Sequence, residues 1–156
     1  MLFLLFQLGR DRYALDAAQV TEVLPLVRVK KIPHAPAGVA GVFTYRGTPV
    51  PVLDLSQLAL GRPARSRLST RVLLVPYPAA DGARRLLGLI AENATETLRR
   101  EPADFVASGV QADGAPYLGP IATDARGLIQ WIEVDKLLPA TVREALFQQV
   151  VEAAAS

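Results

Sequence analysis

Two halves of this chain resemble each other, and this repeat limits the possible folds more than any single motif does. Residues 13–24 read YALDAAQVTEVL and resemble residues 86–98, LLGLIAENATETL, so that a Thr-Glu pair recurs 74 positions later. Residues 46–58, RGTPVPVLDLSQL, likewise resemble residues 126–138, RGLIQWIEVDKLL. Segments that recur in the same order predict two copies of one structural unit. Chance similarity between Val- and Leu-rich segments is the alternative, because Thr-Glu and Arg-Gly pairs are common.

The local pattern predicts that each copy is made of β-strands. Val, Leu and Ile recur in runs of four to eight residues between turn signals, which is typical of strands. These runs form two predicted hairpins, residues 3–8 with 12–16 and residues 71–76 with 86–91. About five strands per copy is the size of a small closed barrel that hides its strand edges. We expect an all-β fold with minor α content, built from two intertwined five-stranded β-barrels at roughly residues 1–70 and 71–139.

The chain ends in a different pattern, which predicts a helix at residues 140–156. Thr141 stands where a helix N-cap is expected, and Glu144 three residues later completes a capping box. The apolar residues that follow recur at helical spacing and form one face: Val142, Ala145, Leu146 and Val150. We expect this face to pack on the barrels.

The composition narrows the class of protein. The chain has 156 residues, enough for a substantial core, and no cysteine. Disulfides, thiolate nucleophiles and zinc-thiolate sites are therefore excluded, which fits a reducing cytoplasm. The first apolar run, MLFLLFQL, is not preceded by basic residues and is too short for a membrane span, so we expect a strand and no membrane insertion. A mean hydropathy of +0.25 is high for a soluble chain and favours some apolar surface for partners.

The residues that usually carry out catalysis are scarce. The one histidine, His34, lies between two prolines in the segment KKIPHAPAG, where a solvated loop side chain is the usual outcome. Carboxylates do not recur at metal-ligand spacing, and no glycine-rich segment is followed by a phosphate-binding lysine. We therefore expect no catalytic residue, no metal site and no cofactor, and we do not expect an enzyme.

A nucleic-acid-binding small barrel is the alternative function. The sequence pI of about 9.2 is basic, and arginines occur in several short groups. The net charge is only +2, however, and nucleic-acid binders usually concentrate their positive charge on one face. The alternative stays open at this point, although the scattered arginines support it weakly.

Residues 42–55, VFTYRGTPVPVLDL, combine features that favour binding. Proline has no backbone N–H, and donors two residues apart in a strand point to the same side, so Pro49 and Pro51 predict one edge without donors. Val50 and Val52 would still present apolar side chains on that strand. The stretch therefore predicts an apolar surface that another strand cannot extend, or simply a protected edge strand.

Arg46 and Gly47 lie between the two strands of this stretch. Gly47 can adopt the positive φ that a tight reversal requires, and Arg46 could be merely solvated beside it. Glu22 is the carboxylate in the same half that could pair with Arg46. Such a pair would contribute little to stability if exposed but could orient a partner if half buried.

Several of these segments resemble the CheW-like adaptor family of bacterial chemosensory systems. The matching segments are FQLGRDRYAL, QVTEVLPL, IPHAPAGVAGVFTYRGTPVPVLDL and LIQWIEVDKLL. The third follows the family pattern P-x-x-V-x-G-V-x-N-x-R-G-x-x-V-P-V-x-D-L from Pro36 to Leu55, with Thr44 in place of the usual asparagine. Tyr45 replaces a commoner aliphatic residue and Pro49 is an additional proline, which would suit an adaptor of a dedicated, alternative pathway.

The resemblance implies a function and two sets of contact residues. Family members are non-catalytic scaffolds of two barrels that couple the cytoplasmic tip of a methyl-accepting chemoreceptor to the regulatory domain of a CheA-type histidine kinase. Nucleic acid is not among the implied partners, and the implied location is the cytoplasm. The implied receptor-binding residues are Val20, Glu22, Val23, Thr44 and Arg46. For the kinase we expect the apolar edge of Pro49, Val50, Pro51 and Val52.

Overall fold

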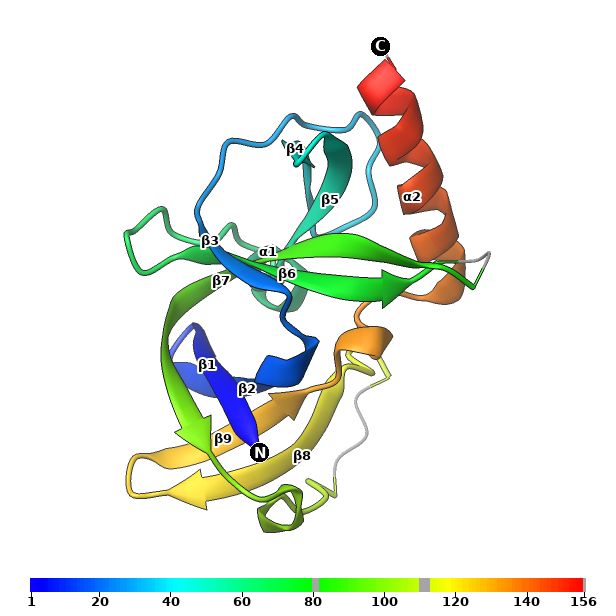
Figure 1. Cartoon of the computed structure of the whole chain (residues 1–156). Coiled ribbons are helices and arrows are strands. Elements are labelled where there is room, and N and C mark those ends of the chain that lie inside the picture. The colour runs from blue at the N-terminus through cyan, green and yellow to red at the C-terminus, as the bar shows by residue number, and fades with distance from the viewer. Residues whose placement is uncertain (80–81, 110–112, 156) are drawn as a thin grey trace.

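The computed structural model describes residues 1–79, 82–109 and 113–155, which form mostly β-strands (Figure 1). The strands are β1 (Leu2–Leu8), β2 (Asp11–Asp16), β3 (Glu22–Pro25), β4 (Val39–Tyr45), β5 (Thr48–Asp54), β6 (Arg71–Pro78), β7 (Arg84–Arg99), β8 (Leu118–Asp124) and β9 (Gly127–Ile132). The helices are α1 (Leu55–Leu60) and α2 (Ala140–Ala155), with the 3₁₀ turns η1 (Ala17–Gln19), η2 (Pro102–Asp104) and η3 (Val134–Lys136). The predicted mostly-β fold with a C-terminal helix is confirmed.

Strand pairing divides the described strands into two groups. In the first, which we call unit 1, the order is β3-β6-β7-β5-β4, and in the second, unit 2, it is β7-β1-β2-β9-β8. Figure 1 shows unit 1 above unit 2, with β7 passing from one into the other. The N-terminal hairpin therefore belongs to the same group as β8 and β9. Pairing thus interleaves the two sequence halves, 1–70 and 71–139, instead of separating them.

Single residue pairs complete both units, so neither is closed by a continuous ladder. In unit 1, Lys30 and Val42 exchange two backbone hydrogen bonds of 2.8 Å each. In unit 2, Val106 and Ile121 do the same, also at 2.8 Å. The expected number of five strands per barrel is correct, but the barrels are not closed by continuous strand pairing. The segment after β3 meets β4, and the segment after β7 meets β8, at one residue pair each.

β7 is the strand that joins the two units. Its residues up to Ala91 pair with β6, and its residues from Glu92 onward pair with β1. Asn93 lies just after this change of partner with a left-handed backbone (φ 51°), and its side-chain amide donates a 2.5 Å hydrogen bond to Gln7. Asparagine tolerates this conformation better than most residues. The change of partner along β7 thus coincides with one left-handed residue.

Three groups of buried side chains fill the molecule. One lies inside unit 1 and includes Val50 and Val52. A second lies inside unit 2, where Phe3 and Trp131 meet edge to face with ring centres 4.9 Å apart. The third and largest lies between the units and under α2. Burial of apolar area of this kind is the main favourable contribution to folding.

The helix α2 and its start at residue 140 are confirmed, but the predicted N-cap at Thr141 is wrong. The helix begins at Ala140, and the N–H of Arg143 donates to the carbonyl of Pro139 at 2.9 Å, so Thr141 is already inside the first turn. Within the predicted apolar face, Leu146 and Val150 are buried but Ala145 is exposed, and Phe147 is buried instead. Ser156, the last residue of the predicted helix, lies outside the described residues.

Candidate functional site

The turn between β4 and β5 places Arg46 in an unfavourable backbone conformation. Tyr45 pairs with Thr48, so the loop is Arg46-Gly47, and both loop residues are left-handed (φ 49° and 80°). This two-residue turn matches the twist of a hairpin, but it prefers Asn or Gly at its first position. An arginine there costs about 1 kcal/mol. Strain kept in a folded protein points to a role for the residue beyond the turn.

The side chains around this turn form a connected group on β3 and the hairpin. The Tyr45 hydroxyl donates a short hydrogen bond to Oε2 of Glu22, and Nη2 of Arg46 lies 3.9 Å from Oε1 of the same carboxylate. The Arg46 guanidinium also stacks over the Tyr45 ring, 5.2 Å from its centre. The predicted pair of Glu22 and Arg46 is therefore present, but Tyr45 holds the carboxylate more closely than Arg46 does.

The hydrogen bond between Tyr45 and Glu22 affects the ionisation of the tyrosine. Donation to Glu22 raises the pKa of the Tyr45 hydroxyl, because loss of that proton would place two negative charges together. The hydroxyl therefore remains a donor at neutral pH. Arg46 is left with 78% of its side chain exposed, so the cation is presented to solvent and to partners.

A double-mutant cycle tests whether Tyr45 holds Glu22. We expect Tyr45→Phe and Glu22→Gln each to lower the free energy of unfolding only slightly, because the site is near the surface. The double variant should cost less than the sum of the two, since the second change removes a contact already lost. Chemical denaturation of the four proteins measures this, and strictly additive costs would contradict the contact.

The structure does not bring all the predicted receptor-binding residues to one face. Alternate residues of a strand point to opposite faces. Glu22 lies on the face of β3 that also holds the partly buried Leu24, whereas Val23 is on the opposite, exposed face. Thr44 is likewise exposed, and Val20, at the end of η1, packs partly into the core between the units. Of the five residues, only Glu22 and Arg46 are thus brought into contact by a described ion pair.

The predicted kinase-binding edge is mostly covered. Pro49 and Pro51 lie opposite Thr44 and Val42 of β4, and the N–H of Val42 turns away from β5 to the Lys30 carbonyl. Both prolines therefore lack a donor on the side of β5 that faces away from β4, as predicted. β5 is not a free edge throughout, however, because residues from Val52 to Asp54 pair with β7.

The side chains of this edge differ from the expectation in their exposure. Val50 and Val52 are 1% and 0% exposed and pack inside unit 1, so they do not form an apolar surface. Pro51 is also buried, and Pro49 is partly exposed. The reason is the alternation of side chains along the strand. Val50 and Val52 alternate with the prolines and face the interior of unit 1, whose position the sequence pattern did not indicate.

Unit 2 repeats the ion pair of unit 1. Nη2 of Arg126 lies 2.8 Å from Oε2 of Glu96, the residues that the repeat aligns with Arg46 and Glu22. Both side chains are more than half exposed, and the neighbouring Thr95 and Thr97 are exposed and polar. Arg126 is not among the described non-glycine residues with positive φ. The second pair therefore lacks the strained arginine of the first turn.

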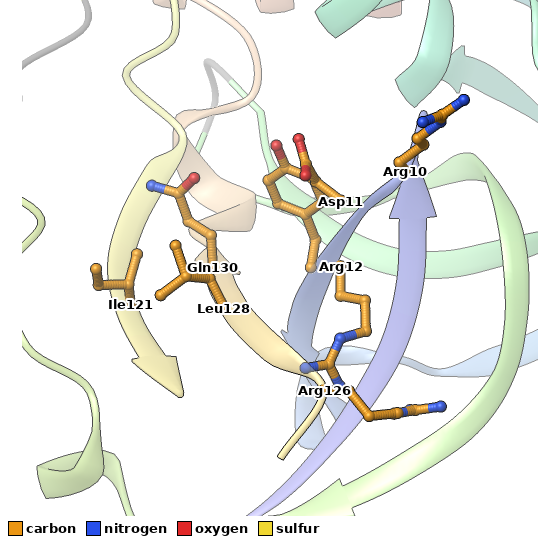
Figure 2. Close-up of a pocket in the computed structure, with 8 residues that line it drawn as sticks. Arg10, Asp11, Arg12, Ile121, Arg126, Leu128 and Gln130 are labelled. Carbon is orange, nitrogen blue, oxygen red and sulfur yellow. The ribbon is translucent and has the colours of Figure 1, made fainter. Parts of the chain in front are cut away.

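A cavity of about 360 Å³ lies beside the second pair, between β2 and the β8–β9 hairpin. Figure 2 shows Arg12 and Arg126 at one end of it and Arg10 at the other. Arg12 is committed to Asp124, with Nη1–Oδ2 and Nη2–Oδ1 distances of 3.0 and 2.5 Å, and also donates to the Gly127 carbonyl. This bidentate contact fixes the hairpin and gives Arg12 a structural role.

The contact between Arg12 and Asp124 predicts a loss of stability in acid. Hydrogen bonding to Arg12 lowers the pKa of Asp124 from 3.8 to about 2. A carboxylate with a lowered pKa stabilises the fold above its ordinary pKa, and this contribution disappears as the pH falls from about 4 to about 2. We expect wild type to exceed Asp124→Asn in free energy of unfolding by about 1 to 2 kcal/mol at pH 6. Urea titrations should show this difference shrinking below pH 4, and a constant difference would contradict it.

The described residues contain no group of three or more His, Cys, Asp or Glu placed to hold a metal ion. His34 is exposed, in a left-handed conformation between the prolines. Among the described helices, none is both long enough and apolar enough to cross a membrane.

Comparison with known proteins gives the family. The family model described as the CheW-like domain matches residues 2–142, which is nearly the whole chain. The chain belongs to the CheW-like domain family. The matched region contains both units and ends just after the start of α2, so most of that helix lies beyond it.

Individual relatives cover most of this CheW-like domain. "Chemotaxis protein CheW" of Rhizobium meliloti (strain 1021) is 28% identical over 145 residues, covering 90% of this chain and 88% of the relative. The protein of the same description from Klebsiella aerogenes is 23% identical over 141 residues, covering 87% and 80%. The crystal structure of the scaffolding protein TtCheW from Thermoanaerobacter tengcongensis superposes with a TM-score of 0.79 at 25% identity, covering 93% of this chain and 92% of that one. These matches favour the adaptor prediction over the nucleic-acid alternative.

Proposed function

We propose that this chain is a non-catalytic adaptor of a bacterial chemosensory complex, which couples the cytoplasmic tip of a methyl-accepting chemoreceptor to the regulatory domain of a CheA-type histidine kinase. Membership of the CheW-like family and the likeness to a scaffolding protein support this proposal. The adaptor acts in the cytoplasm, where both of these partners expose the relevant domains. Its contribution is geometric: it holds two partners at a defined angle and carries out no reaction on either.

The observation that carries the proposal is the strained, exposed Arg46. Its left-handed backbone costs stability, and stacking on Tyr45 beside the carboxylate of Glu22 keeps the guanidinium in one place. Val23 and Leu26 nearby on the chain are large apolar residues that remain 36% exposed. A cation held over an aromatic ring, with exposed apolar side chains on and just after β3, suits a protein contact in which apolar area gives affinity and the charge sets orientation.

The kinase contact of this proposal lies at the end of β5 where Pro49 reaches the surface. Val50, Pro51 and Val52 support this edge from behind, since they are buried. Without donors at the two prolines the edge resists pairing with another strand, so the kinase domain docks through side chains. Weak contacts of this kind become effective when many adaptors, receptors and kinases assemble together.

The test is capture of partners followed by a kinase assay. Immobilised protein is incubated with extract and solubilised membranes of the source cells, and the bound histidine kinases and receptors are identified by mass spectrometry. The captured kinase is then assayed for autophosphorylation with receptor, in the presence and absence of the adaptor. We expect one CheA-type kinase and at least one chemoreceptor, and a change in autophosphorylation that requires the adaptor. Failure to capture a kinase, together with unchanged phosphorylation, would overturn the proposal.

A further inference from the structure

A groove separates the β4–β5 hairpin from the start of β7, and α2 forms one wall of it. The cavity has a volume of about 480 Å³. Its apolar lining comes from three elements that are distant in sequence: Pro49 of β5, Leu86 of β7, and Phe147 and Val150 of α2. Figure 1 shows α2 running beside unit 1 at this place. The groove is therefore a product of the tertiary fold, and the family match stops at residue 142, near the start of α2.

The edge of this groove is basic. Arg46, Arg84 and Arg85 line it, and no Asp or Glu is among the described lining residues. The carboxylates near two of these arginines are loosely held: Glu22 lies 3.9 Å from Arg46, and Asp135 lies 3.7 Å from Arg84 with both side chains about half exposed. Solvent-exposed pairs at such distances are weak. Arg84, and Arg46 where it lies over the Tyr45 ring, can therefore exchange these carboxylates for those of a partner at little cost.

The prolines of β5 decide which type of segment can enter. Pro49 lines the groove, and both Pro49 and Pro51 lack a donor on the side of β5 away from β4. An incoming strand would find no reciprocal hydrogen bonds there, whereas a helix needs none, because its own backbone groups are paired. Val151 extends the apolar lining outward and is 61% exposed. These features favour a helix that presents apolar residues along one side.

We propose that this groove binds an acidic amphipathic helix of a partner protein. Apolar residues of the helix, spaced three and four apart, enter between Pro49, Leu86 and α2, and carboxylates beside them pair with the arginines. The inference goes beyond the proposed function, because it assigns a partner chemistry to a groove that the start of β7 and one side of α2 form beside the β4–β5 hairpin. It does not require that this partner be the receptor or the kinase.

Two synthetic helical peptides of about five turns provide the probe. They share one stripe of leucines and differ only in their flanking residues, which are glutamates in one peptide and lysines in the other. Fluorescence anisotropy with the full chain should give a dissociation constant at least about tenfold lower for the acidic peptide. The preference should disappear in Arg84→Glu/Arg85→Glu. The control Arg65→Glu/Arg67→Glu makes the same change of charge on the exposed loop before β6 and should keep the preference.

A second variant and a spectrum protect the test against misfolding. Val151→Asp changes an exposed side chain. It should weaken binding of the acidic peptide while the circular dichroism spectrum of the protein stays unchanged. Amide NMR shifts should cluster on β5, the start of β7 and α2. Equal affinity for the two peptides, no binding of either, equal loss in the Arg65 and Arg67 control, or displacement of the peptide by an oligonucleotide would each overturn the inference. Kinase and receptor capture by Arg84→Glu/Arg85→Glu is measured separately, so the proposed function stands or fails independently.

Discussion

Replacing Gly41 by alanine is expected to unfold much of unit 1. A Cβ at this position would lie 2.2 Å from the carbonyl oxygen of Lys30 and 2.8 Å from its carbonyl carbon. Both atoms are backbone, and the adjoining Lys30–Val42 pair is the single bridge between the segment after β3 and β4. Relief of the clash must therefore break that bridge. We expect a loss of about 3 kcal/mol or more in free energy of unfolding, and a fall in Tm of about 6 to 12 °C.

Gly61→Ala is the matched control for this experiment. Gly61 also has a positive φ (74°), but nothing lies within 4 Å of the added Cβ. The control therefore includes the backbone strain without the clash and should cost about 1 kcal/mol. Thermal and urea unfolding followed by circular dichroism compare the two variants with wild type. Equal Tm values for the two variants would show that the approach of Lys30 to Gly41 contributes nothing.

Reversal of the charge at Glu22 is expected to remove most receptor binding. Glu22→Arg places a second cation beside Arg46, so the guanidinium loses its carboxylate partner, and the Tyr45 ring under it loses its hydrogen-bond acceptor. Like charges at a contact lower affinity strongly, so we expect the dissociation constant for the receptor to rise by about tenfold or more. Arg46→Glu should have a similar effect. The exchange Glu22→Arg/Arg46→Glu restores opposite charges and should recover a substantial part of the affinity.

The second ion pair provides the control for this exchange. Glu96→Arg/Arg126→Glu alters a pair that the repeat aligns with the first but that lacks the strained turn. Receptor fragments titrated against all variants by calorimetry should bind this control like wild type. If the control weakens binding as much as the single reversals do, the effect reflects overall charge. If the exchange in unit 1 restores nothing, opposite charge at these two positions does not orient the receptor.

Much of the fold could be predicted from local pattern, but the assignment of strands to units could not. Alternation and turn residues predicted the hairpins, and the repeat predicted about five strands per unit. The sequence gives no local sign that β1 pairs with the second part of β7, since these strands are more than 80 residues apart in the chain, as at Phe3 and Leu98. Pairing over such distances depends on tertiary packing, which periodicity does not report.

The candidate site was predicted in part. The charges of Glu22 and Arg46 and the Arg-Gly turn indicated the pair, and the structure brings the two side chains to 3.9 Å. The role of Tyr45 was missed, although its difference from the usual aliphatic residue was a signal: a hydroxyl beside a carboxylate tends to bond to it. The exposure of Val50 and Val52 was predicted wrongly, because the face of a strand that points inward depends on where the rest of the unit lies.

Sharing of one strand gives the molecule a mechanical property. Two domains on a linker can turn independently, whereas here the backbone hydrogen bonds of β6 and β1 are made to one continuous strand. The units cannot swing apart unless those bonds break, which requires local unfolding. In an adaptor of the proposed kind, the angle between a partner on unit 1 and a partner on unit 2 is then set by this shared strand and by the core packed between the units. Such a chain serves as a rigid spacer, and the spacing of an assembly made with it depends on how the two units share β7.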